Sequence, residues 1–203
     1  MDKLDNGLIE KVAESMKLES ALLKAVKLVE SGNRDGFLPN GKPQILFEGH
    51  VMYKLLCRKI GIKSTNRLSR LHPNIIHKNW TRDNYIGGEL EWNRLNSAID
   101  IDKEVAFEST SWGMFQIMGF NYKLCGCSNV LEFVNLMCES HESQLTMMCR
   151  FMYNSGCLKY LKAHDWRGFA KKYNGPKYEE NCYHIKLEKA YKTYKDNEEK
   201  DGK

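Results

Sequence analysis

The stretch that decides the fold of this 203-residue chain is LVESGNRDGFLPNGKPQILFEGH, residues 28–50. An amphipathic helical pattern ends within it at Glu30, and a loop rich in Gly, Asn, Asp and Pro follows. A second acid, Glu48, then stands inside an apolar segment. Two carboxyl groups on either side of such a loop have an ordinary explanation, which is a helix end and an isolated acid. The functional explanation is a pair of catalytic carboxyls lining a cleft.

The segment before the loop has apolar residues at helical spacing, namely Leu22, Leu23, Val26 and Val29. This spacing predicts a helix that begins near Ser20, a suitable N-cap, and ends at Gly32 and Asn33. Asn40-Gly41 predicts a tight turn between Pro39 and Pro43. The loop is therefore expected to form a small β-hairpin or an irregular lobe.

A general acid must carry a proton near neutral pH. Partial burial raises the pKa of a carboxyl, and the negative end of a helix dipole acts in the same direction. Glu30 is at such a helix end. Glu48 follows an apolar run, where an acid is ion-paired, exposed by alternation, or functional. Asp35 and Glu108 compete with Glu48 for the role of second carboxyl, and residue types alone leave that choice open.

The rest of the chain is predicted to be mainly helical. Helical periodicity recurs in residues 5–18, in the segment that closes at Gly61, and in residues 89–101, 103–112, 129–156, 158–176 and 178–195. Residues 63–88 are expected to form a long loop with one short helix. We therefore predict a mainly α fold with a small irregular or β lobe near the first third. A single domain is expected over residues 1–195, followed by a charged tail, 196–203, that frays.

Composition narrows the class of protein. The hydrophobic fraction of 42% and the charged fraction of 28% are typical of a globular chain. A net charge of +5 permits an anionic partner but does not indicate a nucleic-acid binder. Residues 54–82 contain no acid, and this stretch is either a solvated face or a docking surface for an anionic polymer or membrane. Its bases are Lys54, Arg58, Lys59, Lys63, Arg67, Arg70, Lys78 and Arg82.

The seven cysteines form no CxxC pair, so a zinc ribbon is not indicated. Several lie in apolar helical stretches, and we expect reduced thiols and synthesis in a cytosol. Residues 1–10 have no apolar core of a signal peptide, and no run of about 18 apolar residues occurs that could span a membrane. If the substrate lies outside the cytoplasm, another component is expected to release the protein.

Nucleophilic, metal and nucleotide chemistry have little support. Cys138 with His141, and Cys182 with His184, are neighbours in sequence, but catalytic Cys–His partners are usually distant along the chain. No HExxH or similar motif accompanies the remaining histidines. Phosphate-binding glycine loops are absent from the sequence. No metal site and no cofactor are therefore predicted.

Two further clusters have the residue types of a sugar site. In STSWGMFQIMG, residues 109–119, Ser111 and Gln116 could hydrogen-bond a polar ligand and Trp112 could stack on a sugar. Tyr173 and Asn174 stand in KKYNGP at a helix end. The ordinary alternatives are a packed helix start with one satisfied Gln, and a plain helix stop.

Taken together, four ordered segments resemble the N-acetylmuramidase domain of bacteriophage endolysins, and more distantly goose-type lysozymes and lytic transglycosylases. The resemblance runs from about Ala21 to Tyr191, and differs between Ser64 and Tyr85, where the chain is basic. The matching segments are VESGNRDGFLPNGKPQILFEGHVMY, SWGMFQIMGFNY, the fragments FV, NLM, ES and ESQL, and HDWRGFAKKYNGPKYEENCYHIKLEKAY.

The resemblance implies a lysozyme-like helical fold and cleavage of the β-1,4 bond between N-acetylmuramic acid and N-acetylglucosamine. It implies that Glu30 is the general acid and Glu48 the second carboxyl, which stabilises positive charge or acts as a base on water. Ser111, Gln116, Tyr173 and Asn174 match positions that hold sugars.

We expect a monomer that acts on peptidoglycan glycan strands, with the segment from Lys54 to Arg82 contacting an anionic envelope surface. A holin-type pore is the expected export route from the host cytoplasm to the wall. Carboxyl groups about 5–5.5 Å apart would favour retention, and about 6.5–9.5 Å would favour inversion. A lytic transglycosylase that forms 1,6-anhydro ends, and a non-catalytic wall-binding protein, stay as alternatives. An amidase or peptidase would require a metal or Cys–His site.

Overall fold

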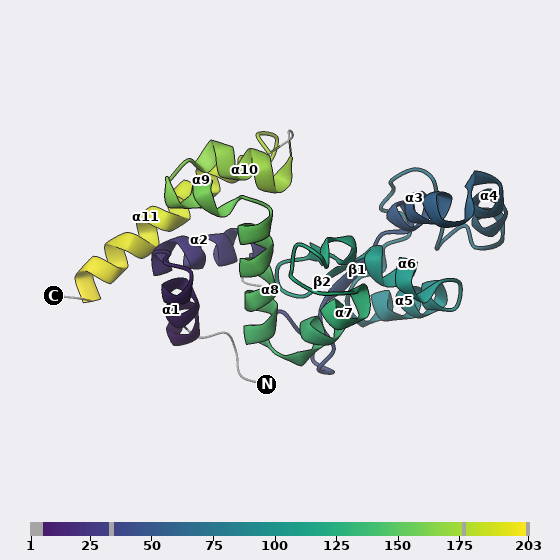
Figure 1. Cartoon of the computed structure of the whole chain (residues 1–203), viewed down its shortest axis with the longest axis horizontal. Helices are drawn as coiled ribbons and strands as arrows, with labels where there is room; N and C mark the ends of the chain where they lie inside the picture. Colours follow the sequence, from purple (N-terminus) through teal and green to yellow (C-terminus); the bar gives the residue numbers. More distant parts are fainter. Residues whose placement is uncertain (1–5, 33–34, 176–177, 202–203) are drawn as a thin grey trace.

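The computed structural model describes residues 6–32, 35–175 and 178–201, and it shows an elongated molecule with two halves (Figure 1). One half is built from helices near the two ends of the chain. The other contains a small sheet and the helices that pack around it, and helix α8 (His141–Asn154) lies between the halves. The predicted mainly α fold with a small β lobe is confirmed.

The helical half joins the start of the chain to its end. Helix α2 packs against α1 and α11, and α10 packs against α9 and α11. Lys24 of α2 is buried, and its ammonium reaches Glu10 at 2.8 Å and Glu198 at 3.1 Å. These contacts hold the helix that carries Glu30 in place from both sides. The bounds are α1 (Asn6–Ser15), α2 (Ser20–Ser31), α9 (Leu158–Lys162), α10 (Trp166–Asn174) and α11 (Tyr183–Asp201).

The sheet has three antiparallel strands in the order β1 (Ile45–Phe47), β2 (Thr110–Trp112) and β3 (Ile117–Met118). The side chains of Ile45 and Phe47 are buried, whereas Gln44, Leu46 and Glu48 are partly exposed. This alternation follows from the two-residue period of a strand. It places Gln44, Leu46 and Glu48 along the open face of the lobe.

The core of this half forms around Trp112, which is fully buried. Its ring meets Trp92 and Phe107 edge to face at centroid distances of 5.8 and 5.7 Å, and its indole N–H donates to the Phe107 carbonyl at 3.1 Å. The surrounding helices are α5 (Glu91–Ile99), α6 (Lys103–Glu108) and α7 (Val130–Glu139), with short 3₁₀ turns η1 (Gly88–Leu90) and η2 (Gly119–Asn121).

Helices α3 (Gly49–Ile60) and α4 (Ile62–Leu71) form a hairpin at the end of the molecule away from α11 (Figure 1). Helix α3 packs against α4 and α6. The hairpin confirms the expected helix end at Gly61. It also places a full helix, α4, where the sequence predicted a loop with one short helix.

Three sequence expectations need correction. Residues 110–112, predicted as the end of a helix, form strand β2, because Ser111 and Trp112 pair with β1 and β3 instead of continuing α6. Ser20 is the first residue of α2 instead of its N-cap, and its hydroxyl donates to Glu198 at 2.5 Å. Helix α11 continues to Asp201, where fraying was expected from residue 196, because Glu198 is held by Ser20 and Lys24.

Other expectations agree with the structure. Gly32 caps α2 in the left-handed conformation, with φ of 53°; the accompanying Asn33 lies outside the described residues. The turn at Asn40-Gly41 closes a small hairpin in which Phe37 and Pro43 form a β-bridge. Residues 129–156 form two helices, α7 and α8. In the described part of the chain, no helix is both long and apolar enough to cross a membrane.

Candidate active site

Glu30 lies in the last turn of α2 and is half-buried. The hydroxyl of Tyr183, from the start of α11, donates a hydrogen bond to Oε1 of Glu30. Burial and then the charge of Glu30 raise the pKa of Tyr183 well above its ordinary value. The same two causes raise the pKa of Tyr173. Both phenols therefore stay protonated beside the Glu30 carboxyl at neutral pH.

Tyr183 and Tyr173 belong to an aromatic stack behind this carboxyl. The rings of Phe169, Tyr173 and Tyr183 all contact one another, with centroid distances of 5.5 Å from Tyr173 to Phe169, 6.2 Å from Tyr173 to Tyr183 and 6.3 Å from Phe169 to Tyr183. Tyr183 also lines a small pocket of about 160 Å³ with Asn174, Tyr178 and Asn181. Asn174 is therefore at a pocket surface, whereas Tyr173 does not line this pocket and packs against Tyr183.

A second pocket, of about 180 Å³, opens in the β lobe. Its walls come from the loop after α2, strand β1, the glycine pair at the start of η1 and the turn between β2 and β3. One of these walls has an acid, Asp35, whose Oδ1 receives the backbone N–H of Phe37 at 3.1 Å and contacts His141 Nε2 at 2.5 Å. The lining residues are Asp35, Gln44, Ile45, Leu46, Gly87, Gly88, Gly113, Met114 and Gln116.

Gln116 and Ser111 are linked at this second pocket. Gln116 lines it with a positive φ of 49°, and its amide donates to the Gly113 carbonyl at 2.8 Å. The Ser111 hydroxyl donates to Gln116 Oε1 at 2.8 Å and is itself buried. Ser111 therefore orients the Gln116 amide instead of facing the pocket. Both residues were predicted to hydrogen-bond a polar ligand, and of the two only Gln116 lines the pocket.

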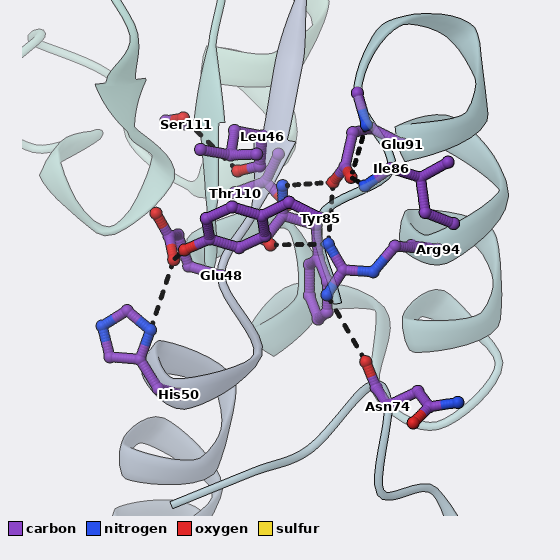
Figure 2. Close-up of polar contacts among 12 residues, drawn as sticks. Leu46, Glu48, His50, Asn74, Tyr85, Ile86, Glu91, Arg94, Thr110 and Ser111 are labelled. Carbon is purple, nitrogen blue, oxygen red and sulfur yellow. Dashed lines mark hydrogen bonds and ion pairs between the residues drawn. The ribbon is translucent and has the colours of Figure 1, made fainter. Parts of the chain in front are cut away.

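Glu48 stands one position beyond β1, on the face shared with Gln44 and Leu46. Figure 2 shows the Tyr85 ring pointing toward it, and the Tyr85 hydroxyl donates to Glu48 Oε2 at 2.5 Å. His50 Nδ1 lies 3.2 Å from the same oxygen, without the alignment of a hydrogen bond. Burial lowers the pKa of His50 even though the charge of Glu48 opposes this. The Glu48 carboxyl is thus restrained by Tyr85 and His50, and 15% of its side chain is exposed.

Next to Tyr85, a buried ion pair between Glu91 and Arg94 stabilises one wall of the second pocket (Figure 2). Glu91 is fully buried and contacts Arg94 at 2.8 Å. The Glu91 carboxylate receives the backbone N–H groups of Phe47, Ile86 and Gly87 at 3.2, 2.7 and 3.2 Å.

Arg94 completes this connection. Its guanidinium donates to the Phe47 carbonyl at 3.1 Å and lies over the Tyr85 ring at 5.7 Å. The Glu91–Arg94 pair therefore connects three parts of the lobe, namely strand β1, helix α5 and the segment that leads to Gly87-Gly88.

Two larger pockets, of about 470 and 510 Å³, lie among the helices of the helical half. Neither is lined by an Asp or Glu, so neither offers carboxyl chemistry. Glu108, the other competitor for the second carboxyl, does not line either small pocket, although burial raises its pKa. Within the described residues, no three His, Cys, Asp or Glu side chains gather as a metal ion would require.

Two of the predicted site residues line small pockets, Asn174 in one and Gln116 in the other. Glu30 and Tyr173 contact Tyr183 of the first pocket, and Ser111 contacts Gln116 of the second, whereas Glu48 lines neither. Sequence reasoning missed Tyr183, Tyr85 and His141 as contacts of the three carboxyls, because each is distant in sequence from the acid that it meets. No local signal in the sequence marks these three residues.

Comparison with known proteins identifies the family of this chain. A family model described as N-acetylmuramidase matches residues 19–195. This chain belongs to the N-acetylmuramidase family. It is therefore a lysozyme-type glycosidase that acts on peptidoglycan. The match includes both pockets and all three carboxyls, Glu30, Asp35 and Glu48.

A solved structure supports the same family. The crystal structure of Burkholderia AP3 phage endolysin has a TM-score of 0.85 and 36% sequence identity, over 95% of this chain and 72% of that chain. No curated protein sequence matches the chain. The expected lysozyme-like fold of this muramidase is confirmed by that structure.

Proposed function

We propose that this muramidase is an endolysin that hydrolyses the β-1,4 bond between N-acetylmuramic acid and N-acetylglucosamine, with Glu30 as the general acid. The observation that carries this proposal is the placement of Glu30 at the end of α2, half-buried and in contact with Tyr183, which lines the first small pocket. A carboxyl that is shielded from water and lies beside a pocket can protonate the leaving oxygen as the glycosidic bond breaks.

Glu48 is proposed as the second carboxyl, which stabilises the positive charge that develops on the sugar ring. The supporting geometry is its place on the open face of β1, in line with the pocket residues Gln44 and Leu46. Tyr85 and His50 restrict the carboxylate. A group already held in position stabilises charge without reorganising during the reaction.

Ser111, Gln116, Tyr173 and Asn174 are proposed to act at the sugar-binding surface in two ways. Gln116 and Asn174 line the two pockets and would contact the glycan directly. Ser111 orients Gln116, and Tyr173 stacks against Tyr183.

The test is digestion of purified peptidoglycan by the wild type and by Glu30→Gln, followed by mass spectrometry of the fragments. We expect reducing N-acetylmuramic ends from the wild type and a loss of activity of about 10²-fold or more in the variant. The variant should keep its melting temperature within a few degrees. Fragments with 1,6-anhydro ends would show that the enzyme is a lytic transglycosylase instead of a hydrolase. Near-normal digestion by Glu30→Gln would contradict the role of Glu30.

We further propose that the segment from Lys54 to Arg82 contacts an anionic envelope surface. Lys63, Arg67 and Arg70 lie at helical spacing on α4, and all three are exposed, whereas Thr65 on the opposite side is buried. Lys59 does not belong to this surface, because its ammonium pairs with Asp102 at 2.8 Å.

Exposed apolar side chains accompany these bases. Ile60, Ile62, Leu71 and Trp80 are 41, 60, 64 and 58% exposed. Arg82 lies over the Trp80 ring at 5.6 Å. Cations beside exposed apolar groups suit contact with an anionic surface that also has apolar character.

A charge-reversal variant tests this surface. Changing Lys63, Arg67 and Arg70 to Glu should weaken sedimentation with isolated cell envelopes at low salt by at least tenfold, and the difference should shrink as salt screens the charges. A variant with the same net charge, Lys11→Glu, Lys186→Glu and Lys189→Glu, should bind like the wild type. Equal binding of both variants would contradict the proposal.

Synthesis in the host cytoplasm and passage to the wall through a pore made by another protein complete the proposed role. The seven cysteines, all within the described residues, are free thiols, and several are buried. Burial raises the pKa of Cys125 to about 12 and that of Cys149 to about 12. Such unreactive thiols suit a protein made in a reducing compartment.

A further inference from the structure

The acid that lines the second pocket is Asp35, five residues after Glu30. Among the residues that form this pocket it is the one ionisable group. Five residues of extended chain reach at most about 18 Å, so Asp35 stays near the end of α2 whatever the path of the loop. The Asp35 carboxylate therefore lines a pocket and is close in sequence to Glu30, the proposed acid.

The carboxylate of Asp35 is held through its Oδ1. Oδ1 accepts the Phe37 backbone N–H at 3.1 Å and meets His141 Nε2 at 2.5 Å. Burial raises the pKa of Asp35, but the hydrogen bonds from His141 and Phe37 outweigh it and lower the pKa overall. The group is therefore ionised at neutral pH. With 43% of its side chain exposed, the carboxylate can still accept a hydrogen bond from a water molecule or a sugar hydroxyl.

His141, the partner of Asp35, is the first residue of α8 and is 5% exposed. Its ring packs edge-on against Phe37 at a centroid distance of 4.8 Å. Nδ1 is buried and has no hydrogen-bond partner. A proton on Nε2 fits this surrounding, because the ring then donates a hydrogen bond to Asp35.

The pocket walls beside Asp35 are also fixed from behind. Gln144, which is fully buried on α8, accepts the Met114 backbone N–H at 2.8 Å and donates to the Gly36 carbonyl at 3.3 Å. A Cβ on Gly36 would come within 2.3 Å of Gln144 Oε1. Asp35 therefore extends from a loop that is packed closely on α8.

Glu48 and Asp35 differ in how far each side chain is exposed to water. Glu48 has 15% of its side chain exposed, and Tyr85 and His50 both contact its Oε2. Asp35 has 43% of its side chain exposed, and it lines the pocket directly. A carboxylate that must receive a proton from water needs an open oxygen next to that water. Asp35 meets this requirement better than Glu48 does.

We propose that Asp35 is a further catalytic residue of this site, the base that takes a proton from the attacking water, and that His141 is the residue that positions it. This inference rests on the proposed role of Glu30 as general acid. It assigns to Glu48 the stabilisation of charge alone.

The proposed step balances as follows. The water oxygen forms a bond to the anomeric carbon while the bond from that carbon to the glycosidic oxygen breaks, and the electron pair stays on the leaving oxygen. Glu30 gives its proton to the leaving oxygen, and Asp35 takes one proton from the water. Exchange with solvent then returns a proton to Glu30 and removes one from Asp35. The anomeric configuration inverts in this scheme.

The first experiment measures turnover of a soluble, peptide-free glycan strand by Asp35→Asn and Asp35→Ala. We expect kcat to fall by about 10²-fold or more, with KM changed little, because the carboxylate acts on water and not on ground-state binding. Added azide should restore turnover of Asp35→Ala and give a glycosyl azide of inverted configuration, since this anionic nucleophile needs no base. A dead Asp35→Ala variant that azide fails to rescue would overturn the role as base.

The second experiment tests His141 with His141→Phe, which keeps a ring against Phe37 but removes the donor. His141 is, among the described residues, the ionisable side chain in contact with Asp35. In the variant, fewer hydrogen bonds oppose the effect of burial, so the pKa of Asp35 should rise. The acidic limb of the kcat/KM profile should therefore move to higher pH. A drop in melting temperature with an unchanged acidic limb would show a merely structural role and overturn the positioning of Asp35 by His141.

Glu30→Gln separates this inference from the function on which it rests. If Glu30→Gln is inactive and Asp35→Asn keeps activity within about threefold of the wild type, Asp35 is not the base and the role of Glu30 stands. If Glu30→Gln is active, the proposed function itself is wrong.

Discussion

The hydroxyl of Tyr183 donates a hydrogen bond to the carboxyl of Glu30 across 153 residues of sequence. This contact joins the two helices, α2 and α11, that pack most extensively in the helical half. The proposed acid is therefore supported by the far end of the chain, and changes in α11 should alter catalysis.

Tyr183→Phe tests this support. The variant keeps the ring that stacks with Tyr173 but removes a donor that favours the ionised form of Glu30. We expect the alkaline limb of the pH–rate profile to move to higher pH, with a loss of stability of about 1 kcal/mol. Tyr178→Phe, in the same pocket, is the control, and an identical profile for all three proteins would contradict the prediction.

Tyr85→Phe tests the support of Glu48. Its hydroxyl is the hydrogen-bond donor to this carboxylate, so the variant should lower kcat by about tenfold while the fold persists. The measurement is turnover of the soluble glycan beside urea unfolding. If kcat is unchanged, the orientation of Glu48 by Tyr85 does not matter for the reaction.

Glu91→Gln tests the buried ion pair that fastens the second pocket. Removing one charge leaves Arg94 buried without its partner, and we expect a loss of about 3 kcal/mol in the free energy of unfolding. The matched control is Glu89→Gln, two residues away and exposed, which should change stability by less than about 0.5 kcal/mol. Similar values for both variants would show that the pair contributes no more than a surface charge.

Gly113→Ala tests the close approach of the β2–β3 turn to α8. Gly113 has a φ of +68°, and an added Cβ would lie 2.6 Å from the side chain of Gln144. Gly156 has a similar φ of +76° but nothing within 4 Å. Backbone strain is therefore common to both variants, and the steric contact is not. Chemical unfolding should show Gly113→Ala to be less stable than Gly156→Ala by about 1–3 kcal/mol, and equal losses would contradict this.

Three phenols with raised pKa values predict a loss of stability in alkali. The pKa values of Tyr85, Tyr173 and Tyr183 are raised, each first by burial and then by a carboxylate. A group with a raised pKa in the folded state stabilises fully below its unfolded value, near pH 10, and loses that contribution as the pH rises toward the folded value. Urea unfolding from pH 8 upward should therefore show a falling free energy above about pH 10. Tyr85→Phe should make this fall less steep, and an unchanged slope would count against the assignment.

Local patterns in the sequence determine most helices of this protein and the position of its first acid. The apolar spacing before Glu30 and the glycine after it are local signals, and α2 begins and ends where they indicate. Asn40-Gly41 and Gly61 likewise mark a turn and a helix end that the structure contains. Backbone geometry and hydrophobic period act over a few residues, so the sequence alone is sufficient for such features.

Strand β2 and the continued end of α11 could not be obtained in this way. Residues 110–112 form a strand because β1, more than sixty positions earlier, supplies their hydrogen-bond partners. The end of α11 is held by Ser20 and Lys24 at the other end of the chain. The local preference of a residue for helix or strand has a smaller effect on its structure than such long-range pairing and burial.

By itself the sequence determined the family, the mainly helical fold and the two acids, Glu30 and Glu48, that deserved testing. The tertiary structure alone decided what surrounds each carboxyl: Tyr183 beside Glu30, Tyr85 beside Glu48, and His141 beside Asp35. The physical reason is that the burial, hydrogen bonding and openness of a carboxyl depend on contacts between segments 37 to 153 residues apart. These contacts decide which acid can give a proton and which can take one.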